Sequence, residues 1–148
     1  MNSESYSVTR IAKEFGMTNQ TIQFYTNEKL VIPDIQNNLG RGGSFRYSKK
    51  NLVELLIIKS LARMGLNLAA IKRILNKLRT SKAKINLGYV CQKCFDKQMI
   101  YPLLIISNVG SNPTVSLDLI NDPFIFNTKW DNMLIIYLRE ILTQVYGD

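Results

Sequence analysis

The sequence predicts a mainly helical first half, in which four helices are joined to a two-stranded wing, followed by a small α+β second half that ends in a helix. Three observations carry this prediction. Apolar residues recur at helical spacing in the first half, a glycine-rich stretch interrupts them at residues 40–43, and the second half has short β-prone runs between turn signals. The chain has 148 residues, of which 46% are hydrophobic and 20% charged, enough for one packed domain or two small ones.

The first two helices form a helix-turn-helix pattern. Ser7 can accept a hydrogen bond at a helix start, and the apolar face that follows consists of Val8, Ile11, Ala12 and Phe15. Gly16 stands where a helix end favours a residue that tolerates positive φ. Thr18 can begin the next helix, which carries Ile22 and Tyr25 inward. In this pattern the second helix enters the major groove of DNA.

A wing and two more helices complete the first half. Leu30–Ile32 is a β-prone run that Pro33 ends, and residues 44–47 alternate polar and aromatic side chains around a glycine-rich loop. Ser48 can begin a third helix, which Gly65 ends. Asn67 can begin a fourth, whose inward residues are Leu68, Ile71, Ile74, Leu75 and Leu78. For most of its outer cations, which are Lys72, Arg73, Lys77 and Arg79, we expect a solvated face.

The positive charge is concentrated in this first half. The whole chain has a net charge of +8. Residues 1–84 hold fifteen Lys and Arg against five Asp and Glu, a net charge of +10, whereas residues 85–148 hold four against six, a net charge of −2. An excess of this kind favours a polyanionic partner, so a nucleic-acid module joined to a second unit is expected.

The order of these parts resembles the DNA-binding domain of the MerR family of bacterial regulators. The segments that carry the resemblance are residues 6–16, residues 21–25, Leu30 with Pro33, residues 45–48, and residues 64–68 leading to Ile71-Lys72. The resemblance implies a winged helix-turn-helix at residues 1–79 that binds inverted-repeat double-stranded DNA as a homodimer and distorts the promoter, where it would meet RNA polymerase. An architectural or excisionase-like DNA binder and a small-molecule-sensing regulator are the alternatives.

The resemblance also implies which residues contact DNA. The residues that would face the groove are Thr18, Asn19, Gln20 and Gln23, and Tyr25, Arg46 and Tyr47 would flank it. Arg41, in the wing, joins Arg46 as an expected phosphate contact. The family usually has Arg where this chain has Gln23. Because Gln is neutral and suits adenine, we expect an altered base preference and about one phosphate contact fewer per protomer.

A short polar linker at residues 80–84 leads to an effector or dimerisation domain at residues 85–148. Strands are predicted at residues 103–106, 115–120 and 124–126. A helix from Trp130 to Tyr146 carries a wide apolar stripe, which must be covered. We expect its cover to come partly from its own chain and partly from a second protomer. The expected dimer contacts are Leu134, Leu138, Ile141, Leu142 and Val145.

Cys91 and Cys94 form the one chemical motif of the second half. Thiols at this spacing can bind zinc or a soft metal, close a disulfide, or be two ordinary thiols. The sequence contains no histidine, so a closed zinc site would need ligands from a second protomer.

Composition also bears on the class of protein. Without histidine, and without a phosphate loop or a convincing carboxylate pair, an enzyme is not expected. The chain has neither an apolar run of about 18 residues nor a signal-peptide pattern, so a cytoplasmic, nucleoid-associated protein with no membrane partner is expected.

Overall fold

The computed structural model describes residues 4–35, 44–80, 101–108, 112–120 and 133–147. The first half contains the helices α1 (Val8–Phe15), α2 (Asn19–Asn27), α3 (Lys49–Arg63) and α4 (Leu68–Thr80). The second half contains the strands β1 (Tyr101–Ser107), β2 (Thr114–Ile120) and β3 (Met133–Tyr137), followed by the helix α6 (Leu138–Tyr146). Among the described helices, none combines the length and the hydropathy of a membrane span.

Local capping fixes the helix-turn-helix. The Ser7 hydroxyl accepts a hydrogen bond from the Arg10 amide at 3.2 Å, and that of Thr18 accepts from the Thr21 amide at 3.1 Å. Between the two helices Gly16 adopts a left-handed conformation with φ 62°, which a side chain would strain. The sequence therefore places α1, the turn and α2 by short-range chemistry, as predicted.

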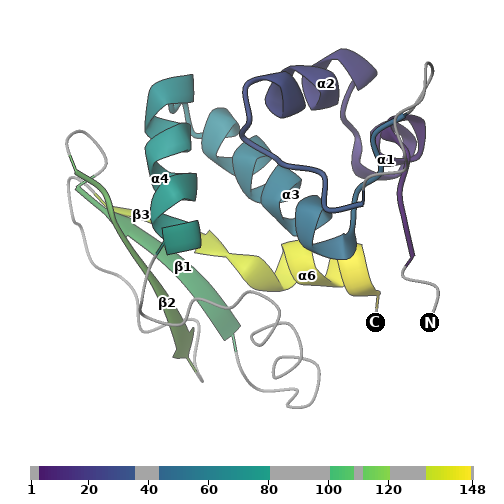
Figure 1. The fold of residues 1–148 in the computed structure, drawn as a ribbon. Coiled ribbons are helices and arrows are strands. Elements are labelled where there is room, and N and C mark those ends of the chain that lie inside the picture. The colour runs from purple at the N-terminus through teal and green to yellow at the C-terminus, as the bar shows by residue number, and fades with distance from the viewer. Residues whose placement is uncertain (1–3, 36–43, 81–100, 109–111, 121–132, 148) are drawn as a thin grey trace.

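Helix α3 is the centre of the molecule. Every residue from Asn51 to Ile58 is buried, as expected for a helix that is covered on all sides. Figure 1 shows α3 running between the α1–α2 pair and α6, with α4 packed beside it. A capping box between Ser48 and Asn51 begins α3, and Asn67 begins α4 by accepting a hydrogen bond from the Ala70 amide.

The three strands form an antiparallel sheet in the order β2-β1-β3. Leu104, at its centre, pairs with Leu117 on β2 and with Ile136 on β3. The sheet lies against α4 through β2 and is continuous with α6 through β3 (Figure 1). One apolar core runs through both halves of the chain, from Tyr6 to Val145. The described part of the second half therefore packs directly on the first.

Two predicted elements differ from the structure. The predicted helix 130–146 is a strand followed by a helix: residues 133–137 pair with β1, and only Leu138–Tyr146 is helical. Leu30–Ile32 forms no strand, because the Leu30 and Val31 amides donate to the Tyr25 carbonyl and so end α2. The wing is represented by one bridge between Ile35 and Arg46. Its loop at residues 36–43, the linker residues 81–84 and the predicted strand 124–126 lie outside the described residues.

Candidate nucleic-acid interface

Helix α2 presents a polar face outward on an apolar anchor. Its inward residues are Ile22, which has no exposed surface, and Thr26, which is 8% exposed. Asn19, Gln20 and Gln23, all predicted to face the DNA groove, are exposed. Their amides can donate and accept hydrogen bonds at base edges. The anchor fixes which side of α2 points away from the core, and the amide side chains lie on that exposed side.

The Thr18 side chain forms hydrogen bonds within the first turn of α2. Its Oγ1 accepts from the Thr21 amide and lies 2.8 Å from Thr21 Oγ1, although the residue is exposed. These bonds hold the first turn of α2. The orphan amides of that turn, together with the helix dipole, favour a negative charge nearby.

The two tyrosines that were expected to flank the groove are partly or fully buried. Tyr25 is half-buried and packs on the core. Tyr47 has no exposed surface, and its hydroxyl lies 2.8 Å from Oγ1 of Thr26. Burial raises the pKa of Tyr47, and the hydrogen bond with Thr26 opposes that shift. With its side chain enclosed, Tyr47 supports α2 from inside rather than offering a surface to DNA.

The base of the wing is attached to the start of the chain. Tyr6 and Tyr47 exchange two backbone hydrogen bonds, of 2.9 and 3.0 Å. Arg46, next to this bridge, is half-buried. Its Nε atom is buried and has no hydrogen-bond partner among the described residues, which is costly for a charged donor. Arg41 lies outside the described residues.

Sequence reasoning missed two residues at this surface. Phe24 is 47% exposed on α2, and its ring centroid lies 5.9 Å from that of Tyr25. Phe24 stands one position after Gln23, and helical spacing places it on the side of α2 away from the buried Ile22. This orientation could have been predicted from the sequence. Lys59 on α3 was also missed, because its contact is non-local. Its Nζ donates to the carbonyl oxygens of Phe15 at 2.9 Å and Gly16 at 3.2 Å.

The first half of the chain has exposed cations on α1, after α2 and on α3. Lys13 on α1, Lys29 after α2 and Lys50 on α3 are exposed, and none has a carboxylate within 4.0 Å among the described residues. Arg10 differs, because it pairs with both Glu4 and Glu14. These interactions raise the pKa of Arg10. Cations without carboxylate partners are available to phosphates.

The remaining predicted sites lie elsewhere. Cys91 and Cys94 are outside the described residues, and no group of three or more potential metal ligands occurs within those that are described. The predicted dimer stripe is covered by its own chain: Leu134 is half-buried and packs on the core, and the others, which are 0–7% exposed, are Leu138, Ile141, Leu142 and Val145. These residues have little surface left for a second protomer.

Comparison with known proteins agrees with this geometry. Residues 6–78 match the MerR HTH family of regulatory proteins. The HTH-type transcriptional regulator CueR of Salmonella typhi is 29% identical over 70 residues, 47% of this chain and 49% of that protein. CueR of Yersinia pestis is 28% identical over 69 residues, 47% of this chain and 48% of that protein. The chain thus spans about half the length of these relatives.

The matched residues run from the bridge at Tyr6 to the core residue Leu78, so they include α1, α2, α3 and most of α4. The family is one of regulatory proteins, and these relatives are named as transcriptional regulators. Residues 6–78, just under half of this chain, are thus similar to the MerR HTH family of regulatory proteins.

Proposed function

We propose that this protein regulates transcription by binding inverted-repeat promoter DNA as a homodimer and distorting the duplex. The observation that carries the proposal is the arrangement of α2, where buried Ile22 and Thr26 hold the helix while Gln20 and Gln23 point into solvent. A helix anchored in this way can lie in the major groove without losing its contact with the core.

The chemistry of the exposed face supports reading of A·T-rich sequence. The amide of Gln can bond to adenine N6 and N7 at once, and an apolar side chain can contact the thymine methyl group. Gln23 and Phe24 offer these two chemistries side by side on α2. Arg46, at the base of the wing, and the exposed lysines would supply phosphate contacts, which set affinity rather than sequence preference.

The homodimer rests on symmetry. An inverted repeat presents the same half-site twice, and a two-fold protein matches it. Because the α6 stripe is largely buried in its own chain, we assign the dimer contact to surfaces other than this stripe. A single winged domain makes few phosphate contacts, so loss of the dimer should weaken DNA binding sharply.

The test is selection of duplexes from a random pool by the full chain, followed by footprinting and sedimentation of the complex. We expect a palindromic consensus and two chains per site. Raising salt from 50 to 200 mM should lower the affinity by about 10³ to 10⁵ if six to ten phosphates are contacted. Failure to enrich any duplex, or binding that salt does not weaken, would contradict the proposal.

A further inference from the structure

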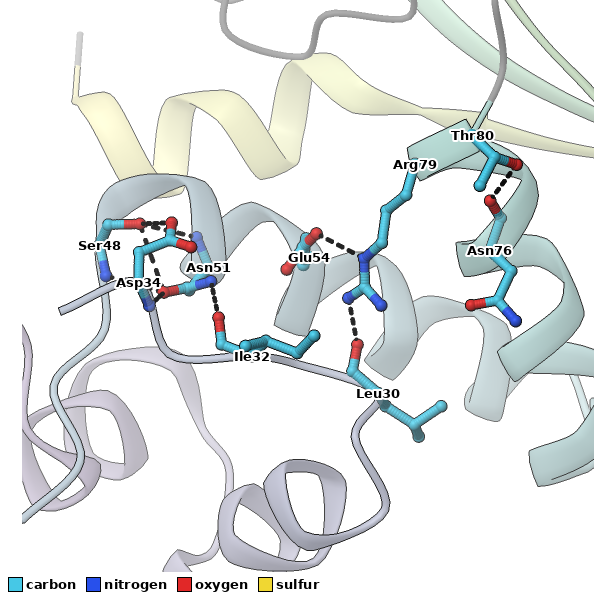
Figure 2. Close-up of polar contacts among 9 residues, drawn as sticks. All are labelled: Leu30, Ile32, Asp34, Ser48, Asn51, Glu54, Asn76, Arg79 and Thr80. Atoms are coloured by element: carbon cyan, nitrogen blue, oxygen red, sulfur yellow. Dashed lines mark hydrogen bonds and ion pairs between the residues drawn. The ribbon is translucent and has the colours of Figure 1, made fainter. Parts of the chain in front are cut away.

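The segment that follows the DNA-reading helix is held by polar side chains from α3 and α4 (Figure 2). Asn51, only 1% exposed, donates from Nδ2 to the Ile32 carbonyl at 2.9 Å. Its Oδ1 accepts from the Asp34 amide at 2.9 Å. The residues nearest α2 are held by a second set of contacts, which involves Leu30, Glu54 and Arg79. We call this set the Arg79 bridge.

The Arg79 bridge joins three elements that are distant in sequence. Nε of Arg79, on the last turn of α4, lies 3.3 Å from Oε1 of Glu54 on α3. An Nη atom of the same guanidinium donates to the Leu30 carbonyl oxygen. The guanidinium can make both contacts because its nitrogens are fixed in one plane. Figure 2 shows the arginine reaching from α4 across α3 to the chain after α2.

Burial of the Glu54 carboxylate makes its pairing with Arg79 necessary. The Glu54 side chain is 10% exposed and that of Arg79 is 28% exposed. A carboxylate enclosed to this degree is costly without a partner, and Arg79 is the cation paired with Glu54 within the described residues. The pair is thus confined to one geometry, in which the free arm of Arg79 meets Leu30.

Leu30 is part of the end of α2. Its side chain has no exposed surface, and its amide donates to the Tyr25 carbonyl at 2.9 Å. Lys29, just before it, adopts a left-handed conformation with φ 57°, as a helix end often does. A displacement of the Leu30 peptide would therefore move the last turn of α2, which begins at Phe24, directly after Gln23.

We propose that Arg79 is a positioning residue for DNA reading, which fixes the end of α2 against α3 and α4 and so sets the orientation of the exposed Gln20, Gln23 and Phe24. This inference deepens the proposed function and rests on it. Loss of the Arg79 bridge should reduce discrimination between the selected duplex and random duplex, because base contacts depend on orientation. Phosphate contacts depend on it less.

The test compares Arg79→Met with Arg73→Met in the full chain. Both variants remove one cation from α4, and Arg73 is exposed and has no carboxylate within 4.0 Å among the described residues. Affinities for the selected duplex and for a scrambled duplex are measured over a range of salt. We expect Arg79→Met to lower the ratio of the two affinities about tenfold, the factor typical of one lost hydrogen bond to a charged group. Arg73→Met should leave the ratio within about twofold. An unchanged ratio in folded Arg79→Met overturns the inference.

A readout without DNA separates this inference from the proposed function. Amide hydrogen exchange should become about tenfold faster at Leu30 and Glu28 in Arg79→Met, while the Ile11 amide in α1 keeps its rate. Unchanged exchange at Leu30 overturns the positioning role even if DNA binding is real. If the wild-type chain selects no duplex, the proposed function fails whatever the exchange shows.

Arg79→Lys keeps the inference testable if the methionine variant unfolds. Lysine retains the charge beside Glu54 but lacks the second arm that reaches Leu30. We expect this variant to fold, to show the faster exchange at Leu30 and to lose discrimination. Wild-type exchange and wild-type discrimination in Arg79→Lys would overturn the inference.

Discussion

The hydroxyl of Tyr47 lies 2.8 Å from Oγ1 of Thr26, which joins the segment just before α3 to α2 from within the core. Thr26 also donates to the Ile22 carbonyl at 2.9 Å. Two backbone bonds hold Tyr47 to Tyr6 as well. The inner side of α2 is therefore bound to the segment that leads from the wing to α3 and, through the Tyr6 bridge, to the start of the chain.

Replacing Tyr47 with Phe should destabilise the protein by about 1 kcal/mol, the usual contribution of one buried hydrogen bond. The variant should also lose less stability at high pH than the wild type does. Because burial raises the folded pKa of Tyr47 above its ordinary value of 10.0, neutral Tyr47 contributes fully below about pH 10, and this contribution is lost as the pH rises through the raised value. Urea unfolding at pH 7 and above pH 10 measures both effects. Equal alkaline losses in wild type and Tyr47→Phe would contradict this explanation.

The turn between α1 and α2 should tolerate asparagine better than alanine. Gly16 has φ 62°, and a Cβ there would lie 3.5 Å from Nζ of Lys59, so the space is adequate and the backbone conformation is the constraint. Gly16→Ala should cost about 1–2 kcal/mol, whereas Gly16→Asn should cost less, since Asn enters the left-handed region more readily. Thermal unfolding ranks the two variants. The reverse order would show that side-chain volume, not φ, limits this position.

Affinity and base preference should respond to different residues. Gln23→Arg would add a cation to the exposed face of α2, so the salt dependence of binding should steepen by about one phosphate contact per protomer and the preferred base should change. Arg46→Ala should weaken binding to all duplexes about equally, because its expected partner is phosphate. Selection from a random pool with each variant, and titration over a range of salt, checks both. A new consensus for Arg46→Ala alone would reverse the assignment.

Phe24 should recognise thymine through its methyl group. Deoxyuridine differs from thymidine only in lacking that methyl, so replacing each thymine of the selected site in turn isolates the contact. We expect one such replacement to weaken wild-type binding by about 1 kcal/mol, within the range for base contacts, and to have little effect on Phe24→Ala. Additive losses from the replacement and the mutation would show that Phe24 does not touch a methyl group.

The helix-turn-helix could be predicted because its signals are local. Ser7, Gly16, Thr18 and Ser48 each act on a backbone group within a few residues, and each occupies the predicted place. The contacts made by Glu54 and Arg79 could not be predicted in this way. They join residues 25 and 49 positions apart, and a cation on the outer face of a helix looks solvated until the fold places it beside a buried carboxylate.

The second half shows why periodicity alone misleads. Leu134 and Leu138 are four residues apart, which fits one face of a helix and also alternate positions of a strand. Pairing with β1 decides the matter for residues 133–137, and that pairing is non-local. Likewise, an apolar stripe on a helix predicts that this face is buried, but it does not show which element packs against it. Here α3 and the sheet cover α6.

The packing of α6 against α3 and the sheet should contribute to the stability of the whole chain. Leu142 on α6 is 2% exposed and belongs to the core that includes α3. Leu142→Ala should cost about 2–5 kcal/mol, and Leu142→Asp more, because an unpaired charge would be buried. Gln144→Asp, on the exposed side of α6, adds the same charge and should change stability by no more than about 0.5 kcal/mol.

Circular dichroism melting and sedimentation of these variants show whether the stripe packs within its own chain or contacts a second protomer. Because the core is shared, Leu142→Ala should lower the melting temperature of the whole chain in one transition and weaken DNA binding through loss of folded protein. If Leu142→Asp instead melted like the wild type but sedimented as a monomer where the wild type is a dimer, the stripe would be a dimer contact after all. The single transition is the expected outcome, since α6 packs on α3, the same helix that shares its core with α1 and α2.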